Sequence, residues 1–118
     1  MIHFKRADRV GGQVQKELSD LLQKEIRDPR LDFVTIMRVS ITDDLRSARV
    51  YFSVSEGGRK LDVMAGFMSA SGYLRRKLSS RLKLRYIPEL EFVYDESFDR
   101  ATRVDKVLKA IRNGNQTG

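Results

Sequence analysis

Residues 69–85 read SASGYLRRKLSSRLKLR, a run of four small residues followed by a segment that mixes leucines with basic side chains. Leu74, Leu78 and Leu82 recur every four residues, and this spacing predicts an α-helix with one apolar face. Serine and glycine are poor helix formers, so residues 69–72 are expected to interrupt the helical region. The pattern therefore predicts two helices, a short one over 61–68 and a second one after a kink.

The second helix is strongly cationic. The window 63–88 contains no Asp or Glu, whereas the other 92 positions hold 17 basic and 16 acidic side chains. Its basic residues are Arg75, Arg76, Lys77, Arg81, Lys83 and Arg85. Charge concentrated in this way indicates a polyanionic partner, and nucleic acid is the simplest one. If all six residues met phosphates, log affinity would fall with log salt with a slope of roughly 4 to 5.

A phosphate-binding element is expected where the two helices join. Ala70, Ser71 and Gly72 are small enough for close approach, and a helix starting at Tyr73 would offer free backbone N–H groups to a phosphate. Ser80 falls on the same helical face as Arg76 and Lys83, opposite the leucines. An ordinary solvated helix face and a simple helix joint remain the alternatives.

Other basic and aromatic residues carry a weaker signal. Arg6 and Arg9 form a smaller basic cluster, which a solvated chain terminus explains equally well. For Arg46 and Arg49, contact with RNA and ordinary solvation are likewise equally compatible with the sequence. For Tyr73 and Tyr86, which flank the basic segment, packing is favoured over stacking on bases.

The rest of the chain predicts an α+β fold. Apolar residues spaced three or four apart predict a helix over 10–26, although two glycines at 11–12 weaken its first turn; Asp8 is the expected N-cap and Pro29 the stop. Alternating patterns over 33–41, 48–54 and 90–94 predict three strands, the first two as an antiparallel hairpin. A last short helix is expected over 104–111. These elements predict a three-stranded sheet with helices packed on one face.

Length and composition indicate a single-domain protein without disulfides or membrane spans. The 118 residues suit a single domain over 1–118, with about 6–112 ordered and 113–118 as a flexible tail. The absence of cysteine excludes disulfides and thiolate chemistry and fits a cytoplasmic protein. No apolar run is long enough for a membrane span, and the absence of Trp disfavours a membrane-surface protein.

Nothing in the sequence predicts catalysis, a metal or a cofactor. His3 is the only histidine and has no partner pattern around it, and the acidic pair at 43–44 suits a hairpin turn. No glycine-rich phosphate loop follows a strand. A small nuclease, which would need a metal or an acid–base cluster beside the basic face, remains a rival hypothesis, as does an architectural DNA-binding protein.

Taken in order, several segments resemble the bacterial ribosome-binding factor A family. Residues 6–10 read RADRV, residues 25–31 read EIRDPRL, residues 70–75 read ASGYLR, and residues 84–92 read LRYIPELEF, followed by YDES at 94–97. Each motif alone is common, but their order and spacing together are specific. The resemblance runs from about Arg6 to Leu108.

The resemblance implies a type II KH-like domain in which an Ala-x-Gly kink replaces the Gly-x-x-Gly loop of ordinary KH domains. It further implies a non-enzymatic assembly factor that binds the free 30S ribosomal subunit and its 16S rRNA, acts in late 30S maturation and 5′-end processing of that RNA, and supports growth in the cold. A GTPase is implied as a release partner, and a monomer is expected.

The resemblance has two departures. Residues 99–102 read DRAT where the family often has a glycine, and the longer charged C-terminal tail of some members is missing. A general KH-like RNA-binding module from another RNA pathway is the main alternative function, because it would share the same basic surface.

Overall fold

The computed structural model describes residues 6–97, 107, 108, 110 and 111. Its elements are α1 (Arg6–Lys24), a 3₁₀ turn η1 (Pro29–Leu31), β1 (Val34–Ile41), β2 (Ser47–Val54), α2 (Lys60–Leu82) and β3 (Glu89–Tyr94). Most of the expected last helix, the expected glycine position near 99–102 and the tail at 113–118 lie outside the described residues.

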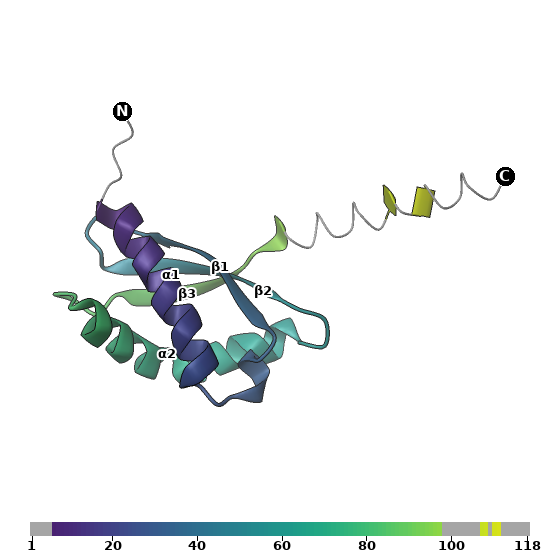
Figure 1. Ribbon diagram of the computed structural model, residues 1–118, viewed down its shortest axis with the longest axis horizontal. Coiled ribbons are helices and arrows are strands. Elements are labelled where there is room, and N and C mark those ends of the chain that lie inside the picture. Colours follow the sequence, from purple (N-terminus) through teal and green to yellow (C-terminus); the bar gives the residue numbers. More distant parts are fainter. Residues whose placement is uncertain (1–5, 98–106, 109, 112–118) are drawn as a thin grey trace.

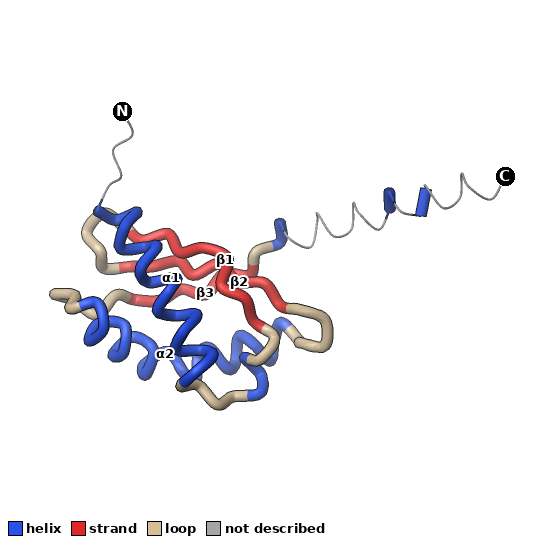
Figure 2. The backbone as a smooth tube through the Cα atoms, in the orientation of Figure 1, coloured by secondary structure: helices blue, strands red, loops and turns tan. Residues whose placement is uncertain are grey.

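The three strands form one sheet in the order β1-β2-β3 (Figures 1 and 2). β1 and β2 pair antiparallel, as the hairpin prediction required, and β3 pairs parallel to β2. Parallel neighbours need a long crossover, and α2 provides it. The expected three-stranded α+β architecture is confirmed.

The core lies between the helices and one face of the sheet. Val50 and Phe52 of β2 are completely buried, together with Leu18 of α1 and Phe67 of α2. The Phe67 ring meets Phe52 edge-on with centroids 5.1 Å apart and stacks on Phe92 of β3 at 4.0 Å. Because α1 and α2 both contribute to this one core, both helices cover the same face of the sheet, as predicted.

α1 approaches β1 closely through a glycine. A Cβ atom on Gly11 would lie 2.9 Å from the carbonyl oxygen of Val39, so only glycine fits without movement of the backbone. One turn further on, Gln15 Nε2 donates a hydrogen bond to the carbonyl of Met37 at 3.1 Å. Of the two glycines expected to weaken the helix, Gly11 is therefore the one that lets α1 pack closely against β1. Asp8 lies inside the first turn of α1 instead of preceding it.

A β-bulge changes the inward face of β1. The pairing register with β2 shifts between Ile36 and Arg38, which leaves Met37 as the extra residue. Before the bulge Val34 and Ile36 pack on the core, and after it Val39 and Ile41 do so. A strict alternation over 33–41 would put Ile36 and Val39 on opposite faces of the sheet, and the bulge is what puts them on the same one.

The expected interruption of the second helical region was also wrong. Residues 69–72 lie inside a single helix, although its axis changes direction between the teal and green halves of α2 (Figure 1). Glycine costs a helix roughly 1 kcal/mol relative to alanine. Fully buried Phe67 and Leu74 anchor the helix on both sides of the small residues, and their burial outweighs that cost. The kink is thus a bend in one helix.

Candidate nucleic-acid interface

The second half of α2 has one buried and one exposed face. Leu74 and Leu78 are completely buried. The opposite face is solvent-exposed and forms what we call the exposed stripe, made of Gly72, Arg76, Ser80 and Lys83. Helical spacing places Gly72, Arg76 and Ser80 within one quadrant of the helix, and the sequence predicted this face for Arg76 and Ser80. Lys83, predicted for the same face, is exposed but follows the last residue of the helix.

Arg76 and Gly72 are neighbours on this stripe. A Cβ atom on Gly72 would lie 3.3 Å from Nη1 of Arg76, so the missing side chain leaves room for the guanidinium over the bend of the helix. Within the described part of the chain, Arg76 makes no ion pair or hydrogen bond. Its charge is therefore available to an external anion.

Lys83 ends α2 in an uncommon backbone conformation. Its φ of 51° and ψ of 44° place it in the left-handed region, where glycine is normally preferred. The backbone N–H groups of Lys83 and Leu84 both donate to the carbonyl of Ser79, which closes the helix. The Lys83 side chain is exposed next to this turn and has no acidic partner among the residues described.

Arg81 does not belong to the exposed stripe. Its guanidinium contacts three acidic residues of α1 or its C-terminal end: Nη1 lies 2.8 Å from Glu17 and 2.8 Å from Asp20, and Nη2 lies 3.1 Å from Glu25. We call Glu17, Asp20 and Glu25 the α1 carboxylates. The side chain of Arg81 is only 28% exposed, and its hydrogen bonds to Glu17 and Asp20 raise its pKa. Arg81 thus holds two helices together.

Lys77 and Tyr73 face the same acidic group. Lys77 Nζ lies 4.0 Å from Glu25, and the Tyr73 hydroxyl donates a 2.7 Å hydrogen bond to the same carboxylate. The bond from Tyr73 is the main reason why the pKa of Glu25 is lowered. The segment has no acidic residue near it in the sequence, but the fold brings acidic residues next to Lys77 and Arg81, so the expectation of a basic helix without acidic neighbours is wrong for these two residues. Tyr73 is half-buried, and its hydroxyl is held by Glu25.

Arg75 is occupied by the backbone. Its Nε donates to the carbonyl of Pro88 at 2.9 Å, and its Nη2 lies 3.5 Å from the carbonyl of Ile87. These contacts attach α2 to the segment that enters β3. Arg75 therefore positions the joint between α2 and β3 and has part of its donor capacity spent inside the fold.

Ala70, Ser71 and Gly72 lie in the bend, with Ala70 and Ser71 half-buried and Gly72 exposed. Since α2 continues through them, their N–H groups take part in intrahelical hydrogen bonds. The prediction of free N–H groups at a helix start before Tyr73 was therefore wrong. What these residues can still offer is a surface without bulky side chains beside Arg76.

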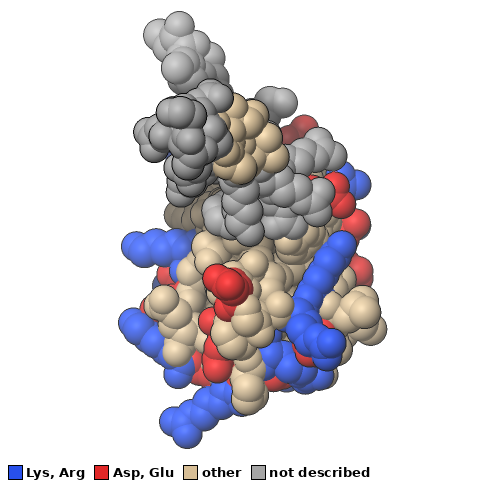
Figure 3. Space-filling model, turned by 90° about the vertical axis from the view of Figure 1, so that its right-hand side faces the viewer, with Lys and Arg blue, Asp and Glu red and all other residues tan. Residues whose placement is uncertain are grey.

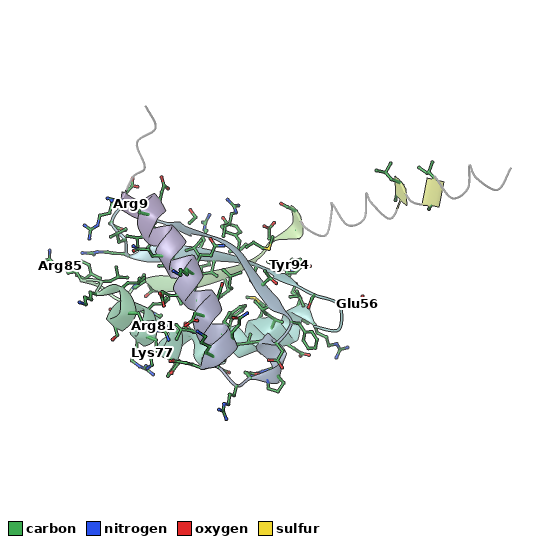
Figure 4. All side chains as sticks on the ribbon, viewed as in Figure 1. Arg9, Glu56, Lys77, Arg81, Arg85 and Tyr94 are labelled. Atoms are coloured by element: carbon green, nitrogen blue, oxygen red, sulfur yellow. The ribbon has the colours of Figure 1, made fainter. Side chains whose placement is uncertain are left out.

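Four other cations that the sequence singled out lie at the end of the molecule where α1 begins, whereas Arg49 pairs with Glu91 at 3.3 Å. Figure 4 shows Arg9 and Arg85 at this end, and Lys77 and Arg81 further along beside α1. Arg85 and Arg46 both approach the ring of Tyr86, with Cζ 5.4 Å and 4.7 Å from its centroid. We call Arg6, Arg9, Arg46 and Arg85 the basic end. The sequence could not decide whether Arg46 belongs to a binding surface, because only the fold brings the hairpin turn beside residue 86.

The opposite end of the molecule differs in charge. Viewed from that side, Lys and Arg side chains occur together with Asp and Glu on the visible described surface (Figure 3). On the exposed stripe and the basic end, Arg76, Lys83 and Arg85 have no carboxylate partner among the described residues. No group of metal-binding side chains occurs among the described residues, and none of their helices is long and apolar enough to cross a membrane.

Comparison with known proteins assigns the chain to a family. The family described as Ribosome-binding factor A matches residues 6–108. A ribosome-binding factor A of Desulfatibacillum aliphaticivorans is 49% identical over 107 residues, covering 90% of this chain and 87% of the relative. The protein of the same name from Syntrophus aciditrophicus is 42% identical over 112 residues, covering 94% and 91%.

Solved structures agree on the fold. The solution structure of a candidate ribosome binding factor A from Thermotoga maritima is 33% identical, has a TM-score of 0.68 and covers 79% of this chain and 90% of that protein. The crystal structure of the Thermus thermophilus protein, at 24% identity, gives a TM-score of 0.68 with 78% and 97% covered. The fold is KH-like. The chain belongs to the ribosome-binding factor A family, a family of ribosome-binding factors and not a known family of enzymes.

Proposed function

We propose that this protein binds the free 30S subunit through the phosphates of its 16S rRNA and promotes late 30S maturation, including 5′-end processing of that RNA. The observation that carries the proposal is the exposed stripe, in which Arg76 and Lys83 point away from the core without a carboxylate partner in the described structure. A homology model of the Thermus thermophilus ribosome binding factor A, 23% identical to this chain with a TM-score of 0.64, has been fitted into a cryo-electron microscopy map of that protein's complex with the 30S subunit, which supports the choice of partner.

The mode of binding follows from the side chains available. Arginine and lysine on a rigid helix contact phosphates and set orientation, but they read little base sequence. RNA recognition would then depend on the shape of the folded rRNA. Binding one rRNA conformation more tightly than others shifts its population, which is how a protein without catalytic groups can promote maturation. The factor would act in the cytoplasm as a monomer, and a GTPase would assist its release.

The salt dependence should be smaller than the sequence alone suggested. Lys77 and Arg81 face the α1 carboxylates, and Arg75 is bound to carbonyl groups. Three phosphate contacts, from Arg76, Lys83 and Arg85, would give a slope of log affinity against log salt of about 2 to 3. Contacts from Arg6 or Arg9 would raise it.

Co-sedimentation with ribosomal particles tests the proposal. The wild-type protein should sediment with free small subunits at low salt and much less with joined ribosomes. The double variant Arg76→Gln and Lys83→Gln should bind several-fold more weakly. The control Lys16→Gln and Arg59→Gln removes two exposed cations elsewhere and should bind almost as the wild type does.

Three results would reject the proposal: no binding of the wild type to small subunits, unchanged binding of the stripe variant, or an equal loss in the control. Equal affinity for unrelated structured RNAs would support the alternative of a general RNA-binding module. Cleavage of precursor RNA by the purified protein with magnesium would instead support a nuclease.

A further inference from the structure

Three segments that are distant in sequence meet at the basic end. The N–H of Glu89 donates a 2.8 Å hydrogen bond to the carbonyl of Arg46, which fixes the start of β3 against the hairpin turn. A cavity of about 200 Å³ opens where this turn, the start of α1 and the end of α2 come together. Its lining consists of Arg6, Asp44, Leu45, Leu84, Arg85 and Tyr86.

Tyr86 is the exposed aromatic ring of this cavity. It is 44% exposed and is not part of the hydrophobic core, whereas its neighbour Leu84 packs against the core. Its hydroxyl has no hydrogen-bond partner among the described residues. Tyr73 differs, because its hydroxyl is bound to Glu25. The hydroxyl of Tyr73 is therefore engaged within the fold, whereas that of Tyr86 is not and much of its side chain is exposed.

The charge around Tyr86 is positive. Arg46 and Arg85 reach the ring from two different elements, and Arg6 lines the same cavity. The one carboxylate of the lining, Asp44, accepts hydrogen bonds from the Thr42 hydroxyl at 2.6 Å and from the Arg46 N–H at 3.0 Å. These bonds lower the pKa of Asp44 and hold it within its own turn. It forms no ion pair with the guanidinium groups.

We propose that Tyr86, with Arg46, Arg85 and Arg6, forms a stacking site for one unpaired nucleotide of single-stranded RNA. The base would stack on the tyrosine ring or on a guanidinium plane, and the remaining cations would contact the flanking phosphates. Bases inside a duplex cannot reach such a ring, so the site distinguishes unpaired from paired RNA. This inference rests on the proposed function and adds to it a site for an unpaired segment of rRNA.

Substitution of the ring tests the stacking site. Tyr86→Leu keeps apolar bulk and removes the aromatic face, whereas Tyr86→Phe keeps the face and removes the hydroxyl. Stacking predicts that Tyr86→Leu weakens binding to a short labelled single-stranded oligoadenylate, measured by fluorescence anisotropy, by about 5- to 150-fold. Tyr86→Phe should bind as the wild type does, and both variants should melt near the wild-type temperature because the side chain is half exposed.

A second variant separates stacking from charge. Arg46→Gln should reduce the magnitude of the slope of log affinity against log salt by about 0.7, the value for one phosphate contact on a single strand, whereas Tyr86→Leu should leave that slope unchanged. The same oligonucleotide annealed to its complement should show no dependence on Tyr86. Equal binding of wild type and Tyr86→Leu, or an equal loss in Tyr86→Phe, would overturn the stacking site.

Parallel measurements with small ribosomal subunits keep the two proposals apart. If the wild type binds subunits but neither assay depends on Tyr86, the stacking site is wrong and the proposed function stands. If oligonucleotide binding depends on Tyr86 but subunits do not bind, the proposed function is wrong and the stacking site stands. If the wild type binds neither, both are rejected.

Discussion

Replacing Lys83 by glycine should stabilise the protein and weaken its RNA binding at the same time. The residue lies at φ 51° and ψ 44° at the end of α2. For a residue with a Cβ atom this left-handed conformation costs roughly 1–2 kcal/mol, which glycine does not incur. The greater freedom of glycine in the unfolded chain offsets part of the gain. The expected net effect is an increase of about 1 kcal/mol in the free energy of unfolding.

The same substitution removes one exposed cation from the proposed interface. The midpoint of thermal unfolding should rise by roughly 4 °C for a domain of this size. The slope of log affinity for small subunits against log salt should fall by about 0.7 to 0.9, as expected for one lost phosphate contact. Urea denaturation followed by circular dichroism measures the first effect, and sedimentation at several salt concentrations measures the second.

Lys83→Gln is the matched control for this experiment. It removes the charge but keeps a Cβ atom, so it should weaken binding equally and change the free energy of unfolding by less than about 0.5 kcal/mol. If Lys83→Gly proves no more stable than Lys83→Gln, the argument from backbone strain is wrong. If both variants bind small subunits with wild-type salt dependence, Lys83 is not part of the interface.

Three further predictions concern the packing of the helices. Gly11→Ala should destabilise by about 1–3 kcal/mol in urea denaturation because its Cβ would meet the Val39 carbonyl, whereas Gly12→Ala, with nothing within 4 Å, should stabilise by up to about 1 kcal/mol; equal effects would refute the close contact. Arg81→Gln should lower the melting temperature by removing the cation that joins the three α1 carboxylates to α2, but it should weaken RNA binding less than Arg76→Gln, and a reversed order would contradict the roles assigned to these two residues. The pKa of Asp20 is lowered mainly by Lys24 and then by Arg81, and the pKa of Glu25 is lowered mainly by Tyr73. The stability that these two carboxylates contribute is therefore present above about pH 4 and is lost as pH falls through their folded-state pKa values. Acid titration should show a smaller loss of stability in Arg81→Gln than in the wild type.

Much of the fold follows from local patterns. Alternation in 48–54 predicts β2 correctly, because Ala48, Val50 and Phe52 are buried and the half-buried Val54 packs against the core. Alternation fails in β1 since one extra residue, Met37, reverses the inward face, and no local signal marks that bulge. The continuity of α2 was missed because propensity alone does not include the burial of Phe67 and Leu74.

The candidate site was predictable only in part. The exposed face with Arg76 and Lys83 follows from helical spacing and is found as expected. The ion pairs of Arg81 could not be read from the sequence, because Glu17 is 64 positions away from it. The meeting of Arg46 with Tyr86 likewise depends on how β3 pairs with β2, which the strand patterns alone do not determine.

The parallel pairing of β3 has a consequence for synthesis of the chain. During translation, α1 and the hairpin can come together once Val54 has left the exit tunnel, whereas the third strand becomes available only after Tyr94. Until then Phe67 lacks its stacking partner Phe92, and β2 alone supplies the strand contacts to the apolar side of α2. Nascent chains that stop between α2 and β3 should therefore be prone to aggregation, and those extended past Tyr94 should resist proteolysis.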